Sequence, residues 1–446
     1  MYNPLFLPEI REMLAENSVA ELRECCTALH PARTAEFMEG LTAEETWRVL
    51  QHADEATRVE IFHYFELPKQ IESLETQPQE EVAGLITKLA SDDRVDLLNE
   101  VDHEIVERLL PLLPSEERRD ILHLRSYPEG TAGAVMTTAF AKLAETLTIR
   151  QAFDELQHQA EGLETIYYVY IVDDGRHLMG FVSLRKLIQS RPTAKIESII
   201  DRGVISVRVD DDQEHVANEV LKYAFLAIPV VDDQNRLVGI VTHDDAAEVL
   251  QEEATEDAHL AGAVQPLEDG YIATPFWELC WKRGMWLVIL LGAASLTAQV
   301  MQFLEGGESA SWMVLFLPMV LASGGNAGSQ SATLVIRALA LDETDGRVLW
   351  IAGREARVGA VLGAVLASLS WIVARGMAGT EPSYIVSLTV FCVVAMGTIF
   401  GAMLPLALNR LKFDPALMSN PLIAALSDIL GVVIYYNISA AIVKLI

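Results

Sequence analysis

Residues 318–336 read PMVLASGGNAGSQSATLVI and lie in the most apolar third of the chain. Such a segment is expected to cross a membrane as a helix, yet glycine, serine and amide side chains occupy its centre. Polar groups at membrane depth are tolerated where they are buried in protein or line a wet path. Close packing of helices on small residues is the alternative role for the glycines. The stretch therefore predicts a membrane domain in which this helix either packs tightly or borders a polar pathway.

Other long apolar segments surround this stretch, and each can span about 30 Å of hydrocarbon. We expect five spans, at residues 284–304, 312–339, 356–375, 384–409 and 417–443. Basic residues gather in the loops of one side: Lys282, Arg283, Arg337, Arg347, Arg354, Arg357, Arg410 and Lys412. The opposite loops, EGGESAS and RGMAGTEPS, hold one basic residue between them. The positive-inside rule then places the N-terminus in the cytosol and the C-terminus outside.

Charge is divided unequally along the chain. Residues 271–446 hold ten acidic and ten basic residues, so the whole net charge of −30 lies on the first 270 residues. Nucleic acid is excluded as a partner by this sign, because it is itself a polyanion. A soluble portion that handles cations fits, and a plainly solvated surface is the alternative. The four cysteines form no CxxC pair, which excludes a recognisable zinc site or disulfide framework.

The soluble portion contains two kinds of region. Apolar residues recur at helical spacing through residues 1–127, and TAEE at 42–45 is a capping-box start. Next comes an internal repeat, in which YVYIVDDGRHLMGFVSLRKLI matches AIPVVDDQNRLVGIVTHDDAAEVL. The repeat resembles paired CBS domains. We expect an all-α N-domain at 1–127, an α/β CBS pair at 128–250 (repeats at about 135–190 and 199–250), a connecting helix at 251–283 and an all-α membrane domain at 284–446.

Asp428 lies in the middle of the last expected span, SNPLIAALSDILGVVIYYNI, with no basic residue near it in that span. A carboxylate at such a depth costs at least ~2.5 kcal/mol on insertion scales and is a functional hypothesis by default. Carboxylate, amide and hydroxyl oxygens favour Mg²⁺ or Ca²⁺ over softer metals. A protonated Asp428, a hydrogen bond to a neighbouring helix and a proton relay are the alternatives. The sequence therefore predicts a site for a hydrated divalent cation in the membrane.

Five motifs follow one another along the chain: YPEGTAG at 127–133, EATED at 253–257, the polar stretch at 318–333, REARVG at 354–359 and DILG at 428–431. In this order they resemble the MgtE family of bacterial magnesium channels, over the whole chain. The resemblance implies a multidomain membrane protein with five transmembrane helices in the plasma membrane of a bacterium. It also implies a homodimer with the pore at the subunit interface. Some members of the family bind ATP at the CBS pair, which makes ATP a candidate ligand beside Mg²⁺.

The resemblance also implies roles for individual residues. The pore site falls on Asp428, with backbone oxygens near Ala424, and relatives often carry threonine near this aspartate where AALS stands here. The pore-lining positions are Pro318, Gly324, Gly325, Asn326 and Gln330. The regulatory Mg²⁺ ligands that hold the channel closed are Asp93, Asp96, Asp245, Glu256 and Asp257. Glu355 is a rim or gate position, for which an ion pair with its neighbouring arginines is the alternative.

Two other classes of function were weighed. A cation-coupled exchanger or exporter of divalent metals could use the same scaffold, with Asp428 as its proton- or Na⁺-linked site. A membrane metalloprotease would need HExxH or a comparable ligand set. The expected spans contain no histidine, and HEIVE at 103–107 lacks the second one. We therefore expect a transport protein and no enzyme.

Overall fold

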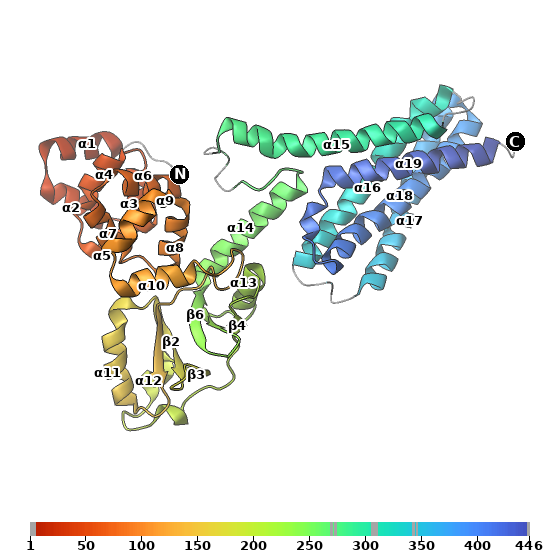
Figure 1. The fold of residues 1–446 in the computed structure, drawn as a ribbon. Coiled ribbons are helices and arrows are strands. Elements are labelled where there is room, and N and C mark those ends of the chain that lie inside the picture. The colour runs from red at the N-terminus through yellow and green to blue at the C-terminus, as the bar shows by residue number, and fades with distance from the viewer. Residues whose placement is uncertain are drawn as a thin grey trace. The chain divides into compact units, whose positions relative to one another are not determined.

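The chain forms two units, residues 1–250 and residues 251–446, which are drawn in Figure 1. The computed structural model describes residues 6–267, 271, 274–304, 311–340, 344 and 347–443. Each unit has its own hydrophobic core.

An array of short helices opens the first unit (Figure 1). The helices are α1 (Leu7–Glu16), α2 (Val19–Thr27), α3 (Pro31–Met38), α4 (Ala43–Leu50), α5 (Glu55–His63), α6 (Leu67–Thr76), α7 (Gln79–Ile86), α8 (Ser91–Glu100), α9 (His103–Leu109) and α10 (Ser115–Leu124). Thr42 and Glu45 form the expected capping box at the start of α4. One face of each helix is buried, which accounts for the helical spacing of apolar residues.

Two three-stranded sheets follow, with the orders β1–β2–β3 and β4–β5–β6. Their elements are β1 (Phe140–Ala144), α11 (Ile149–Gln159), β2 (Thr165–Val172), β3 (Leu178–Ser183) and α12 (Leu184–Gln189), then β4 (Val207–Arg208), α13 (Gln213–Lys222), β5 (Ala227–Val231), β6 (Leu237–Thr242) and α14 (His243–Ala261). In each sheet the first two strands are parallel and the last two antiparallel. The sequence repeat therefore corresponds to two sheets with the same strand order and the same strand directions.

The second unit consists mainly of long helices (Figure 1). They are α15 (Phe276–Leu304), α16 (Ser311–Ala340), α17 (Val348–Ala378), α18 (Thr380–Arg410) and α19 (Asn420–Val443). Four of them, α15, α17, α18 and α19, are long and apolar enough to cross a membrane. The fifth helix, α16, has 30 residues, but its central small and polar residues reduce its apolar character. The expected count of five spans is therefore not reached by length and composition alone.

The connecting segment differs from the single helix expected at 251–283. Helix α14 begins at His243, directly after β6, and ends at Ala261. Helix α15 then begins at Phe276, so the aromatic residues at 276–281 belong to the first membrane helix. Trp277 and Trp281 are exposed there, as suits side chains at a membrane interface.

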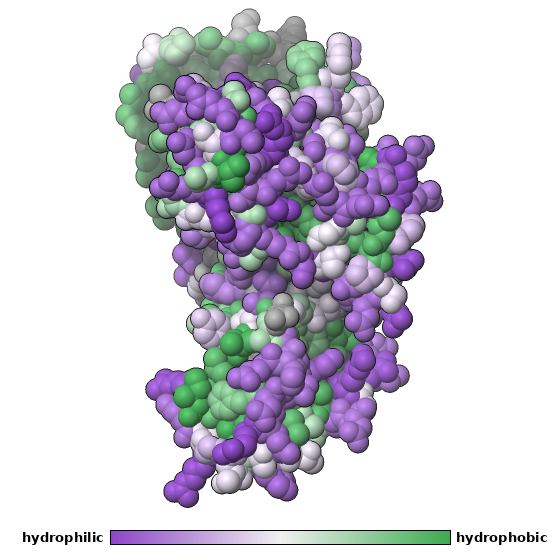
Figure 2. All heavy atoms as spheres, turned by 90° about the vertical axis from the view of Figure 1, so that its left-hand side faces the viewer, coloured by the Kyte–Doolittle hydropathy of each residue, from purple (hydrophilic) through white to green (hydrophobic). Residues whose placement is uncertain are grey.

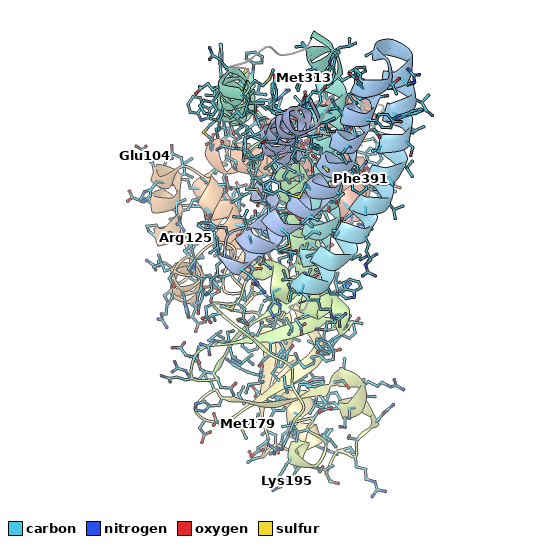
Figure 3. The ribbon with its side chains drawn as sticks, turned by 90° about the vertical axis from the view of Figure 1, so that its right-hand side faces the viewer. Glu104, Arg125, Met179, Lys195, Met313 and Phe391 are labelled. Atoms are coloured by element: carbon cyan, nitrogen blue, oxygen red, sulfur yellow. The ribbon has the colours of Figure 1, made fainter. Side chains whose placement is uncertain are left out.

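Helix α18 is the centre of the membrane unit, and α15 is its periphery. The apolar window of α18 is 56% buried, whereas that of α15 is 6% buried. Packing around α18 positions α16 and α17, and α19 lies against α16. Phe391, labelled in Figure 3, belongs to α18 and meets α17 at Gly363. Helices α16 and α19, which carry the candidate pore residues, are thus positioned by contacts with the buried helix α18.

Candidate ion pathway and regulatory carboxylates

Asp428 lies on α19 and is partly buried. No charged side chain acts on its carboxylate among the residues that the structure describes. Ala424, one turn earlier, contacts α16, since a Cβ added at Gly325 would lie 3.3 Å from the Ala424 Cβ. The candidate ion site and its neighbouring backbone oxygens therefore lie beside the polar stretch of α16.

The polar stretch of α16 has two different faces. Pro318, Asn326 and Gln330 are exposed in a single chain. Gly324 and Gly325 are buried. The amide side chains therefore lie on an open face, and the glycines lie in contacts between helices.

The glycines permit a very close crossing of α16 and α18. Each helix carries two glycines four residues apart, Gly324 and Gly328 on α16 and Gly397 and Gly401 on α18. A Cβ added at Gly397 would lie 2.7 Å from the Gly324 carbonyl oxygen, and one at Gly401 would collide with the Gly328 carbonyl oxygen. Backbone against backbone is the contact that small residues provide in membrane helices. Within one chain, these glycines therefore serve the close packing of helices, which is the alternative to a pathway role.

Ser427 is 3% exposed, and its hydroxyl has no partner among the described residues. A Cβ added at Gly328 would lie 3.0 Å from its Oγ atom. The hydroxyl therefore lies in the junction of α16 with α19, away from the open face of α16.

Hydrogen bonds fix the C-terminal half of α16 on two sides. Ser329 donates to the Asn420 carbonyl oxygen at 3.0 Å, and Thr333 donates to Asn420 Oδ1 at 3.0 Å. On the other side, Ser331 Oγ donates to Glu355 Oε2 of α17 at 2.5 Å.

The arginines next to Glu355 contact other groups. Arg354 lies over the Trp350 ring, 5.4 Å from its centroid. Arg357 Nε donates to the Gly353 carbonyl oxygen at 3.0 Å. The ion pair considered for Glu355 is thus replaced by a hydrogen bond to the neighbouring helix.

Carboxylates gather in the first unit around the start of α14. Asp92 and Asp93 lie on α8, Asp244 and Asp245 lie on α14, and Glu164 lies just before β2. Burial, with Asp244 and Asp93 as neighbours, raises the pKa of Asp245 to about 6, although a hydrogen bond from Thr242 opposes the shift. Burial, with Asp245 and Asp93 nearby, raises the pKa of Asp92 well above its usual range. The group is therefore electrostatically strained when no cation lies between its members.

His63 is a basic neighbour of this group. Its Nδ1 atom lies 2.9 Å from Asp93 Oδ2. The hydrogen bond to Asp93 raises the pKa of His63, against the opposing effect of burial. Asp96, one turn further along α8, is exposed.

A second group of carboxylates lies in the second unit. It joins Glu253, Glu256 and Asp257 of α14 to Asp414, which precedes α19. Burial, followed by Asp414 and Glu253, raises the pKa of Asp257, and Arg337 lowers it. Burial, followed by Glu253 and Asp414, raises the pKa of Glu256. Both groups thus place α14 carboxylates beside carboxylates from other elements.

Several of these carboxylates were not expected from the sequence: Asp92, Glu164, Asp244, Glu253 and Asp414. A usable signal existed for Asp414. It lies in the short loop LKFDP, on the side to which the basic residues assign the connecting segment. No three His, Cys, Asp or Glu side chains of the described ranges are close enough together to hold a metal ion alone.

The organisation and the site define a class of protein, a divalent cation transporter. Residues 317–438 match the MgtE family of divalent cation transporters, and residues 29–130 match the MgtE intracellular N domain. Residues 132–192 and 196–252 match the CBS domain. The chain is 36% identical over 439 residues to the magnesium transporter MgtE of Thermus thermophilus, covering 96% of this chain and 97% of the relative. It is 31% identical over 443 residues to that of Bacillus subtilis, covering 99% and 98%. The chain belongs to the MgtE family of magnesium transporters.

Two solved structures each resemble about half of this chain. The soluble part of a magnesium transporter matches with a TM-score of 0.52 and 36% identity, over 55% of this chain and 97% of that one. The cytosolic domain of the Mg²⁺ channel MgtE in complex with ATP matches with a TM-score of 0.51 and 34% identity, over 54% and 98%. Magnesium is the transported ion of this family, and the chain is a magnesium transporter.

Proposed function

We propose that this magnesium transporter is a Mg²⁺-selective channel, completed by a second copy of the chain and closed by cytosolic Mg²⁺. The observation that carries the proposal is the open polar face of α16, with exposed Asn326 and Gln330, beside the Asp428 site on α19. Amide side chains facing lipid are costly. A second copy across this face would cover them and give the pore two Asp428 carboxylates.

The pore site is proposed to hold Mg²⁺ largely through water. Mg²⁺ dehydrates reluctantly and is commonly bound by one or two carboxylates with several waters retained. One Asp428 from each copy, with backbone oxygens near Ala424, suits such an ion. Pro318, Asn326 and Gln330 border the path in this proposal, and Gly324 and Gly325 let α18 and α19 approach closely behind it.

Closure by Mg²⁺ is proposed to act on the two carboxylate groups. Asp93 and Asp245 belong to the first group, and Glu256 and Asp257 to the second. A cation bound between such carboxylates removes their repulsion, so Mg²⁺ favours the arrangement in which they lie close together. Helix α14 carries members of both groups, which makes it the element through which Mg²⁺ would act on the pore. Asp96 is proposed as an outer ligand on the exposed side of α8.

The topology in this proposal has five spans, with α16 as the second, in a bacterial plasma membrane. The basic loops favour a cytosolic N-terminus and an extracytoplasmic C-terminus. Consistent with an aqueous setting, the side of the first unit shown in Figure 2 is largely hydrophilic. ATP is proposed as a second ligand of the CBS pair, supported by the ATP complex of the similar cytosolic domain.

Patch-clamp recording in reconstituted membranes tests the channel directly. Current should appear when cytosolic-side Mg²⁺ is micromolar and should disappear as it rises to ~10 mM, a range that covers weak Mg²⁺ and Ca²⁺ sensors. The current should follow the Mg²⁺ electrochemical gradient alone. Mg²⁺ uptake that needs a proton or Na⁺ gradient, without measurable current, would support the coupled exchanger instead.

A further inference from the structure

Glu355 lies where three helices of the membrane unit meet. Its α17 backbone lies against α18. The Thr398 hydroxyl, which donates to the Ala395 carbonyl oxygen of its own helix at 3.0 Å, lies 3.4 Å from the Glu355 carbonyl oxygen. Gly359, one turn later, permits this approach because a Cβ there would collide with the Thr398 hydroxyl. The Glu355 side chain points to the third helix, α16, and accepts the hydrogen bond from Ser331.

This carboxylate joins two helices that otherwise touch little. Helix α17 packs along α18, and its contact with α16 is short. Ser331 is 3% exposed, so its hydroxyl depends on a protein acceptor. Among the residues that the structure describes, the Glu355–Ser331 hydrogen bond is therefore a polar link from α17 to α16.

Ser331 directly follows Gln330, which is on the open face of α16. A rotation of α16 about its axis would move Gln330 and Asn326 out of their places along the proposed pore. The bonds from Ser329 and Thr333 to Asn420 restrain α16 from the α19 side, and the Glu355 bond restrains it from the α17 side. We infer that Glu355 is a positioning residue, which fixes the rotation of α16 through Ser331 and so sets the geometry of the ion path; the inference rests on the proposed pore.

Single-channel recording of the full-length protein at micromolar Mg²⁺ tests this inference. Glu355→Ala and Ser331→Ala should each lower the unit conductance about tenfold, the size of effect that loss of a supporting hydrogen bond has at metal sites. The unit conductance of the double variant should be no lower than that of the more impaired single variant, because both changes remove the same bond. Glu355→Gln should stay close to wild type, because its amide oxygen can still accept from Ser331.

Matched controls separate positioning from general damage. Ser323 lies on α16 but donates to the Met319 carbonyl oxygen of its own helix, and Glu381 is an exposed carboxylate of α18. Ser323→Ala and Glu381→Ala should keep wild-type unit conductance. Unit conductance is measured per molecule, so fewer folded channels would not lower it.

Three results would overturn the inference: wild-type conductance in Ser331→Ala, additive losses in the double variant, or a Gln variant as impaired as the Ala variant. If Glu355→Ala does not fold, the Ser331→Ala and Glu355→Gln comparisons still decide. If the wild type carries no current but takes up Mg²⁺, the channel proposal fails. The same variants are then compared by uptake rate per folded molecule, which tests the positioning role separately.

Discussion

The carboxylate group around Asp245 and the crossing of α16 with α18 are built on opposite principles. Around Asp245, burial and then the neighbouring like charges raise the pKa of Asp245 and of Asp92. At the crossing, Gly401 and Gly328 bring two backbones together with no room for a methyl group. Protons or cations would stabilise the first region by reducing this repulsion, whereas shape stabilises the second. A transporter that is regulated by the ion it carries needs both a region whose groups can move apart and a region whose helices stay in contact.

The largest expected effect comes from filling the helix crossing. Gly401→Ala places a Cβ against the Gly328 carbonyl oxygen, and a backbone atom cannot yield as a side chain can. We expect a destabilisation of roughly 3 kcal/mol or more, at the upper end for overpacking. Thermal unfolding in detergent measures it.

Gly376→Ala on α17 is the matched control, since nothing lies within 4 Å of a Cβ there. It should be neutral or slightly stabilising, because alanine favours a helix over glycine. Equal stability of the Gly401 and Gly376 variants would contradict the shape-based account of the crossing.

The next effect concerns transport alone. Asp428→Ala should abolish Mg²⁺ flux and leave the fold intact, because it removes the carboxylate proposed to hold the ion. Ser427→Ala is its control on the adjacent residue. The Ser427 hydroxyl is buried without a described partner, so its removal should cost little stability and keep the flux. Fluorescent Mg²⁺ uptake into vesicles compares the two, and normal flux in Asp428→Ala would end the assignment of the pore site.

A third variant tests whether carboxylates of α14 mediate closure by Mg²⁺. Neutralising Asp245, Glu256 and Asp257 together should raise the Mg²⁺ concentration for half-closure by about tenfold or more, within the range of allosteric couplings. The unit conductance should stay unchanged, because the pore residues are intact. The control neutralises three exposed acids of the N-terminal helices, Glu9, Glu12 and Glu55. A similar shift in both triple variants would mean that net charge, and not these sites, sets the response.

The comparison also shows what the sequence could supply. Helical spacing, the repeat and the apolar runs predicted the class of each region, because these patterns report burial within one element. Partners across elements were harder to predict. Glu355 was considered with its neighbouring arginines, but Arg354 stacks on Trp350 and the carboxylate accepts from Ser331. The faces that Gly324 and Gly328 present likewise depend on Gly397 and Gly401 of α18, which lie 73 residues further along the sequence.

The smallest expected effect is a pH dependence of the first unit without Mg²⁺. The folded arrangement raises the pKa of Asp245 from 3.8 to about 6, so between these values the folded state binds more protons than the unfolded one. Stability should then fall as pH rises through about 6, by on the order of 3 kcal/mol at most. His63 adds to the same trend, because Asp93 raises its pKa and its protonated form is favoured in the folded state.

Limited proteolysis of the full-length protein in chelator should cleave the N-terminal helices faster at pH 7.5 than at pH 5. Asp245→Asn should reduce this difference, and saturating Mg²⁺ should remove it, because a bound cation takes the place of the protons. Cleavage that does not depend on pH in chelator would show that protonation of Asp245 does not control the stability of the N-terminal helices.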